Sequence, residues 1–151
     1  MTDTLETGPI AQIAVVVGDI ESKARAWAKL FGKPVPEIRI TDSVETAHTE
    51  YRGEPTPARA KLAFLRFGDL SVELIEPIDG PSTWRDQLEA HGDSLHHIAF
   101  RIQGMTEVLE LLDGQGISLV QRGEYTGGRY AYCDAERELG LVLEFLENDS
   151  E

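Results

Sequence analysis

The chain has 151 residues, 41% of them hydrophobic, which is enough for one domain with a buried core. Its 27 acidic side chains outnumber its 14 basic ones, and the net charge of −13 repels nucleic-acid phosphates and anionic membrane surfaces. We therefore expect no nucleic-acid partner and no membrane partner. The chain also lacks the ~20-residue apolar stretch of a membrane span, the features of a secretory signal and a second cysteine to pair with Cys133, so we expect a cytoplasmic protein.

The first half of the chain begins with a strand and an amphipathic helix. Residues 10–17 are rich in β-branched side chains and predict a buried strand. Asp19 is suited to cap the next helix, whose apolar stripe is formed by Ile20, Ala24, Trp27 and Phe31. Residues 37–57 are more polar and end in a proline-rich turn. Residues 61–67 and 70–75 then predict two strands joined by a tight Gly-Asp turn.

The second half repeats this order after a short helix predicted at about residues 82–91. A strand at 96–102 is followed by a helix whose apolar stripe is formed by Met105, Val108, Leu109 and Leu112. Three further strands are predicted, at 117–122, 129–133 and 139–146. Each half therefore has the order β-α-β-β-β, and we predict an α+β fold in which residues 1–151 form a single domain. Its parts are module one at about 9–78, the linker helix at about 82–91 and module two at about 94–147.

The two halves also repeat one another residue by residue. The segment Gln12–Asp19 returns as His97–Gly104, and each half closes on a strand with one glutamate between apolar residues, Glu73 in the first and Glu144 in the second. The first half is longer between these positions, and the excess falls in residues 37–57, where a loop absorbs length at little cost. A ligand-capable side chain thus occupies the same two positions in both halves.

These four side chains, Gln12, Glu73, His97 and Glu144, are candidate metal ligands. An unpaired buried charge costs several kcal/mol, and a divalent ion supplies a partner. Three oxygens and one nitrogen suit Zn, Co, Ni or Mn with open positions better than a closed structural zinc site. Other interpretations stay open: Glu144 as a water-facing edge residue, and His97 as a core histidine. His96 is a rival ligand, but strand alternation predicts that it faces away from His97, and His97 is the residue that aligns with Gln12.

At these residues the chain resembles the vicinal oxygen chelate superfamily, which includes glyoxalase I, methylmalonyl-CoA epimerase, ring-cleaving dioxygenases and bleomycin-resistance proteins. The resemblance covers residues 10–146 and is most specific in Val72–Pro77 and Gly92–Phe100, which are similar to methylmalonyl-CoA epimerases. It implies two tandem β-α-β-β-β modules that form a U-shaped mixed-sheet cleft, with metal ligands on the first and last strand of each module. The ligand order Gln, Glu, His, Glu is instead similar to zinc-type glyoxalase I, and residues 133–140 lack the lysine- and serine-containing turn common in CoA epimerases.

The resemblance implies a homodimer that acts as a divalent-metal-dependent isomerase or lyase on a small-molecule carbonyl or thioester substrate. Such an enzyme abstracts a proton next to the carbonyl through a metal-stabilised enolate, and Glu144 and Glu73 are the candidate catalytic bases. Epimerase-like chemistry is the leading prediction. The alternatives are a glyoxalase I-like lactoylglutathione lyase and a non-enzymatic small-molecule or antibiotic-binding resistance protein, whose cationic ligand would suit the acidic chain.

One further enzyme class and four further residues are also candidates. An iron-dependent extradiol dioxygenase fits less well, because it needs two histidines and the ligand set holds one. Arg122 and Arg129 are candidate anchors for an anionic substrate, although isolated arginines near loops are usually solvated. Tyr130 and Tyr132 are candidates either for the cleft wall or for simple packing.

Overall fold

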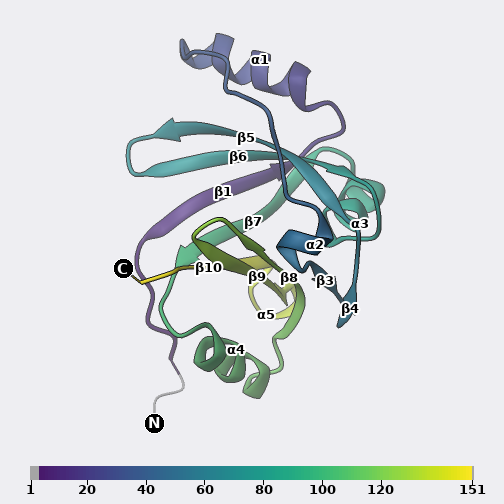
Figure 1. The fold of residues 1–151 in the computed structure, drawn as a ribbon. Helices are drawn as coiled ribbons and strands as arrows, with labels where there is room; N and C mark the ends of the chain where they lie inside the picture. The colour runs from purple at the N-terminus through teal and green to yellow at the C-terminus, as the bar shows by residue number, and fades with distance from the viewer. Residues whose placement is uncertain (1–3, 151) are drawn as a thin grey trace.

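The computed structural model describes residues 4–150 (Figure 1). Residues 1–3 and 151, which the predicted domain includes, lie outside the described residues. Module one contains β1 (Ile10–Val16), α1 (Ile20–Phe31), β2 (Arg39–Ile40), α2 (Val44–Ala47), β3 (Glu50–Tyr51), β4 (Glu54–Pro55), β5 (Arg59–Phe67) and β6 (Leu70–Ile78). After α3 (Thr83–His91), module two contains β7 (Ser94–Arg101), α4 (Met105–Gly114), β8 (Ser118–Tyr125), β9 (Gly128–Ala135), α5 (Glu136–Leu139) and β10 (Leu141–Asn148).

The described strands form one mixed sheet in the order β2-β5-β6-β1-β7-β10-β9-β8-β3-β4. The modules meet where β1 pairs antiparallel with β7, while β1 pairs parallel with β6 and β7 pairs parallel with β10. The sheet curls around a cleft, which confirms the predicted α+β class of two tandem modules around a mixed-sheet cleft. Within the described residues, no helix has the length and apolar character to cross a membrane.

The strand register follows the sequence repeat. The repeat superimposes Gln12 on His97 and Glu73 on Glu144. The paired residues of the sheet obey the same relation. The pair Ala14–His97 corresponds to the pair Ala99–Gln12, and the pair Ala14–Glu73 corresponds to the pair Ala99–Glu144. The positions that the sequence aligns are therefore also equivalent in the sheet.

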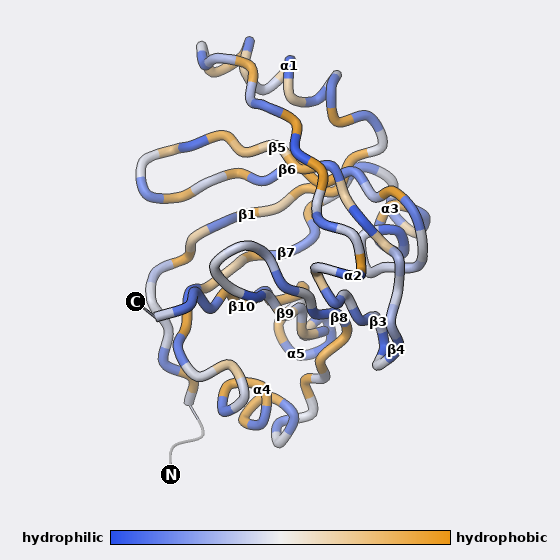
Figure 2. Tube along the Cα trace, viewed as in Figure 1, coloured by the Kyte–Doolittle hydropathy of each residue, from blue (hydrophilic) through white to orange (hydrophobic). Residues whose placement is uncertain are grey.

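Side-chain alternation turns the two glutamates away from the helices. Val72 and Leu74 pack in a core with α1, so Glu73 between them faces the other side of β6. Leu143 and Phe145 pack in a core with α4, so Glu144 between them faces the other side of β10. Figure 1 shows α1 and α4 at opposite ends of the molecule, and Figure 2 shows apolar residues recurring along α4 and the strands next to it.

The extra residues of module one reach across to module two. They form α2, β3 and β4, and β3 pairs antiparallel with β8 at the far edge of the sheet. The Arg52 amide donates to the Val120 carbonyl at 2.8 Å, and the Tyr51 hydroxyl donates to the Asp86 carboxylate of α3. The segment predicted as polar and loop-like therefore links the two modules through backbone pairing.

Candidate metal centre

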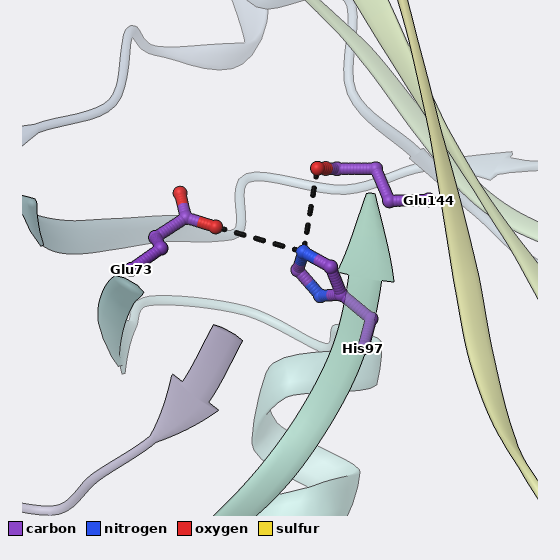
Figure 3. A group of neighbouring side chains, drawn as sticks. All are labelled: Glu73, His97 and Glu144. Atoms are coloured by element: carbon purple, nitrogen blue, oxygen red, sulfur yellow. Dashed lines mark ion pairs between the residues drawn. The ribbon is translucent and has the colours of Figure 1, made fainter. Parts of the chain in front are cut away.

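Three of the four predicted ligands converge on one point of the cleft. Glu73 on β6, His97 on β7 and Glu144 on β10 point toward one another (Figure 3). His97 Nε2 lies 3.6 Å from Glu73 Oε1 and 3.3 Å from Glu144 Oε1. One ligand atom from each residue lies within 4.8 Å of the others. Three residues that are distant in the chain therefore lie close enough together to bind one cation.

The same three atoms are buried without partners. Among the described residues, no group hydrogen-bonds to Glu73 Oε1, His97 Nε2 or Glu144 Oε1. Buried polar atoms are nearly always satisfied, because leaving one unpaired costs free energy. A divalent cation would take a lone pair from each atom, and this mixture of oxygen and nitrogen donors suits Zn, Co, Ni or Mn. The residues present therefore fit a metal ion.

Burial shifts the protonation of this cluster toward neutral forms. It lowers the pKa of His97 to about 3. Burial raises the pKa of Glu144 to about 8, although a hydrogen bond from Tyr132 and the charge of Arg101 act in the opposite direction. The pKa of Glu73 is raised well above its ordinary value by burial and by the neighbouring Glu144 carboxylate. A bound cation would favour the ionised carboxylates.

Gln12, the fourth predicted ligand, is half-buried on β1 and lines the same cleft as Glu73 and Glu144. Its register position is the equivalent of His97 in the other module. Its place in the cleft is compatible with the predicted role, and coordination by its amide oxygen stays a prediction.

The cleft around the cluster has a volume of about 510 Å³, the size of a small-molecule site. Its wall includes five aromatic residues, which come from both modules and from α3: Phe64, Trp84, Tyr125, Tyr130 and Tyr132. Tyr130 and Tyr132 thus line the cleft, as one of the two interpretations of the sequence had it. The arginines in the described lining are Arg39 and Arg101.

Arg122 and Arg129 lie outside this described lining, contrary to their suggested role as substrate anchors. Arg122 pairs with Glu50 at 3.3 Å, and Arg129 pairs with Glu147 at 2.7 Å and with Asp149. Their charges are already matched by acidic neighbours. Arg39 and Arg101 were missed because neither sequence pattern indicates a side chain that faces a cleft: Arg39 lies in the polar segment 37–57, and Arg101 lies near the end of the strand predicted at 96–102.

The prediction that His96 faces away from His97 was wrong. Ala14 is opposite His97 but Val15 is opposite Leu95, so His96 is one extra residue on β7, a β-bulge. The bulge breaks the alternation and turns His96 inward, where its Nδ1 lies 2.7 Å from His97 Nδ1. Burial and the neighbouring His97 lower the pKa of His96 well below its ordinary value, against a hydrogen bond at Thr83 that raises it.

Comparison with known proteins agrees with this architecture. A sequence model of the Glyoxalase/Bleomycin resistance protein/Dioxygenase superfamily matches residues 11–132, a range that holds Gln12, Glu73 and His97 but ends before Glu144. The uncharacterized protein YqjC of Bacillus subtilis (strain 168) is 32% identical over 92 residues, which span 59% of this chain and 66% of that protein.

Several solved structures share the fold. The hypothetical protein BH1468 from Bacillus halodurans C-125 has a TM-score of 0.66 at 19% identity, covering 95% of this chain and 96% of its own. A methylmalonyl-CoA epimerase variant from Streptomyces coelicolor, in complex with 2-nitronate-propionyl-CoA, has a TM-score of 0.65 at 16% identity, covering 96% and 97%. The methylmalonyl-CoA epimerase from Mycobacterium tuberculosis has a TM-score of 0.63 at 17% identity, covering 99% and 94%.

Proposed function

We propose that this protein, which belongs to the Glyoxalase/Bleomycin resistance protein/Dioxygenase superfamily, is a divalent-metal-dependent enzyme that moves a proton on the carbon next to a carbonyl. The observation that carries the proposal is the cluster of three buried, unpartnered atoms on Glu73, His97 and Glu144. The superfamily membership expected from the sequence is confirmed. The reaction and the metal are our inference.

The metal would be held by Glu73, His97 and Glu144, with Gln12 as a further candidate ligand in the same cleft. When bound, a divalent cation supplies Lewis-acid stabilisation for the negative charge that develops on a carbonyl oxygen. The rest of the chemistry belongs to the side chains of this chain.

The proposal assigns the proton transfer to the two glutamates. They lie on β6 and β10, which flank the central pair β1 and β7 from opposite sides. One carboxylate can take a proton from one side of a bound carbon, and the other can return it from the other side. Burial raises the pKa of Glu144 to about 8 in the metal-free site, and a bound cation would lower it, so that the carboxylate would be ionised and able to accept a proton at neutral pH.

The cleft wall suits an anionic acyl compound. Its aromatic side chains offer apolar surface to the acyl chain. Arg101 is the candidate anchor for a carboxylate, because the other arginine of the lining, Arg39, already pairs with Glu37 at 3.5 Å. Such a cleft would accept the carboxylate of an acidic acyl thioester, so the epimerisation of a methylmalonyl-CoA-like substrate is our first assignment.

A glyoxalase I-like reaction on a glutathione hemithioacetal is the second candidate. The observation that favours it is the ligand order, since Gln12 rather than a histidine lies at the first-strand position in the cleft. Both reactions begin with removal of a proton from the carbon next to a carbonyl. An epimerase returns a proton to the same carbon, whereas the glyoxalase reaction delivers it to the neighbouring carbon, and the substrates also differ in their thiol carrier.

Proton NMR in deuterated water separates these candidates. The metal-loaded protein is offered methylmalonyl-CoA and the glutathione hemithioacetal of methylglyoxal in separate samples, and we expect exchange of the α-proton of methylmalonyl-CoA. Glu110→Gln, an exposed change on α4, is the matched control for Glu144→Gln. Exchange of the hemithioacetal alone would assign the glyoxalase reaction. A purified protein that holds no metal and is indifferent to chelator would favour the non-enzymatic binding protein.

A further inference from the structure

We propose that His96 is a positioning residue that sets the tautomer of His97, an inference that rests on the proposed metal site. His96 is buried in the β7 bulge beside a candidate ligand, and the proposed proton chemistry does not use it. Its ring lies 4.9 Å from the His97 ring, centroid to centroid, at an interplanar angle of 80°. Because a buried polar ring needs hydrogen-bond partners, the partners of His96 indicate its role.

If a cation binds to His97, the position of the hydrogen on each of the two neutral rings is determined. A neutral imidazole carries one N–H, and a ligand nitrogen must offer its lone pair. His97 faces the cluster with Nε2, so its hydrogen lies on Nδ1 and is donated to His96 Nδ1 at 2.7 Å. His96 then carries its own hydrogen on Nε2, which lies 3.2 Å from Thr83 Oγ1.

The far end of this hydrogen-bonded chain is fixed by secondary structure. Thr83 opens α3, which Ser82 caps by accepting from the Arg85 amide at 3.0 Å. The Thr83 amide in turn donates to Gln121 Oε1 at 2.9 Å. The Tyr132 ring packs against both histidines, with centroids 5.3 Å and 4.8 Å away. His96 is therefore held on three sides and can present Nδ1 to His97 in a fixed orientation.

The opposite tautomer would disable the site. It places the hydrogen of His97 on Nε2, between the two carboxylates, where a cation would have to bind. An acceptor at the position of His96 Nδ1 favours the form that leaves Nε2 free. Partners of metal-ligating histidines typically act in this way, and their loss costs roughly 10–100-fold in metal affinity.

Two variants of His96 test the role of the acceptor. His96→Leu removes it, whereas His96→Asn places a carbonyl oxygen near the position of Nδ1; both remove the contact with Thr83. Affinity for Zn²⁺ or Co²⁺ is measured by competition with a chelator, and the free energy of unfolding is measured on the same samples. We expect His96→Leu to weaken binding by roughly 10–100-fold and His96→Asn to recover most of that loss.

NMR of the unaltered protein tests the tautomer directly. The chain has four histidines, so ¹⁵N labelling of histidine in the zinc-loaded protein gives an interpretable spectrum. We expect His97 to carry its hydrogen on Nδ1. A hydrogen on Nε2 of His97 would overturn this inference and would also exclude that nitrogen as a metal ligand. Equal affinity in His96→Leu and the unaltered protein would overturn this inference alone. An unaltered protein that binds neither metal would overturn the proposed function together with it.

Discussion

The two modules share a backbone arrangement but differ in how they hold their site residues. In module two, Glu144 accepts a hydrogen bond from Tyr132, whose hydroxyl accepts from the Trp84 indole at 3.1 Å. An indole N–H can only donate, so the hydrogen of the Tyr132 hydroxyl is left for Glu144. His97 has its own neighbour in His96. Both candidate ligands of module two are thus supported by a directed hydrogen bond.

Module one lacks the matching support at Glu73. The β5 residue opposite Glu73 is Phe64, whereas the β9 residue opposite Glu144 is Tyr132. Phenylalanine has no hydroxyl, and the pKa of Glu73 is raised by burial and by Glu144 without the opposing side-chain hydrogen bond that Tyr132 provides to Glu144. The duplicated sheet therefore places the glutamates equivalently, while a single hydroxyl makes their surroundings unequal.

The largest effect is expected from exchanging each glutamate for its amide. If Glu73 and Glu144 serve opposite faces of the substrate, Glu73→Gln and Glu144→Gln each lower epimerisation by about 10²–10⁴-fold, the usual contribution of a general base. Each variant should still exchange the α-proton of one enantiomer, and the two variants should spare different enantiomers. Proton NMR in deuterated water on separated enantiomers measures this.

This prediction fails clearly in two ways. If both variants spare the same enantiomer, the carboxylates do not serve opposite faces. If Glu144→Gln keeps full turnover on the true substrate, Glu144 is not the base. Glu110→Gln on α4 should behave as the unaltered protein throughout.

The next largest effect is a loss of metal affinity, which should differ between His97 and Gln12, the equivalent positions on the first strands of the two modules. We expect His97→Ala to weaken metal binding by more than roughly 100-fold, beyond the loss that follows removal of an outer partner. Gln12→Ala should weaken it much less, because a neutral amide oxygen is a weaker ligand and water can replace it. Chelator competition with Zn²⁺ measures both. Equal losses of affinity would mean that the two modules contribute equally to metal binding, which would contradict the expected difference between them.

A smaller effect is expected from exchanging the aromatic residues beside the glutamates. Tyr132→Phe leaves the buried Trp84 indole N–H without its acceptor and should lower the free energy of unfolding by about 1–3 kcal/mol. Phe64→Tyr adds a hydroxyl at the equivalent, partly exposed place and should change it by less than about 0.5 kcal/mol. Denaturant titration measures both values. Similar losses in the two variants would contradict the difference between the modules.

Much of this arrangement could be predicted from the repeat, and the rest depends on features that no repeat encodes. Aligning Gln12 with His97 and Glu73 with Glu144 identifies equivalent positions of the duplicated strands. Glu73, His97 and Glu144 converge there, and Gln12 lines the same cleft as the two glutamates. The inward turn of His96 could not be predicted, since a bulge inserts one residue without altering the side-chain pattern.

Long-range pairing is the other feature that the sequence hides. The inserted segment pairs through Glu50 with Arg122, residues separated by 72 positions. Glu50 belongs to a polar segment with no apolar alternation, and the strand predicted at 117–122, which Arg122 ends, carries nothing that indicates this partner. The hydrogen bond from Tyr132 to Glu144 is hidden for a similar reason, because alternation gives the face of a residue but not the direction of its hydroxyl.

The last prediction concerns the metal-free protein and the dependence of its stability on pH. Burial raises the pKa of Glu144 to about 8 and that of Glu73 well above its ordinary value, so the folded cluster keeps protons that the unfolded chain has lost. The stability from these raised pKa values is complete below about pH 4.5 and is lost as pH rises through the folded values, by about 1.4 kcal/mol per pH unit for each retained proton.

The window between pH 6.5 and 8 isolates this contribution from that of His97. Burial lowers the pKa of His97 from 6.5 to about 3, so its stabilising contribution is lost only below pH 6.5. In chelator-treated protein, we expect the free energy of unfolding to fall from pH 6.5 to 8 and to fall less in Glu144→Gln, with Glu110→Gln as control. Zinc should abolish the fall, because a bound cation keeps both carboxylates ionised at every pH in the window. Equal slopes with and without zinc would mean that these carboxylates do not face the metal, and the two modules would then lose their shared centre.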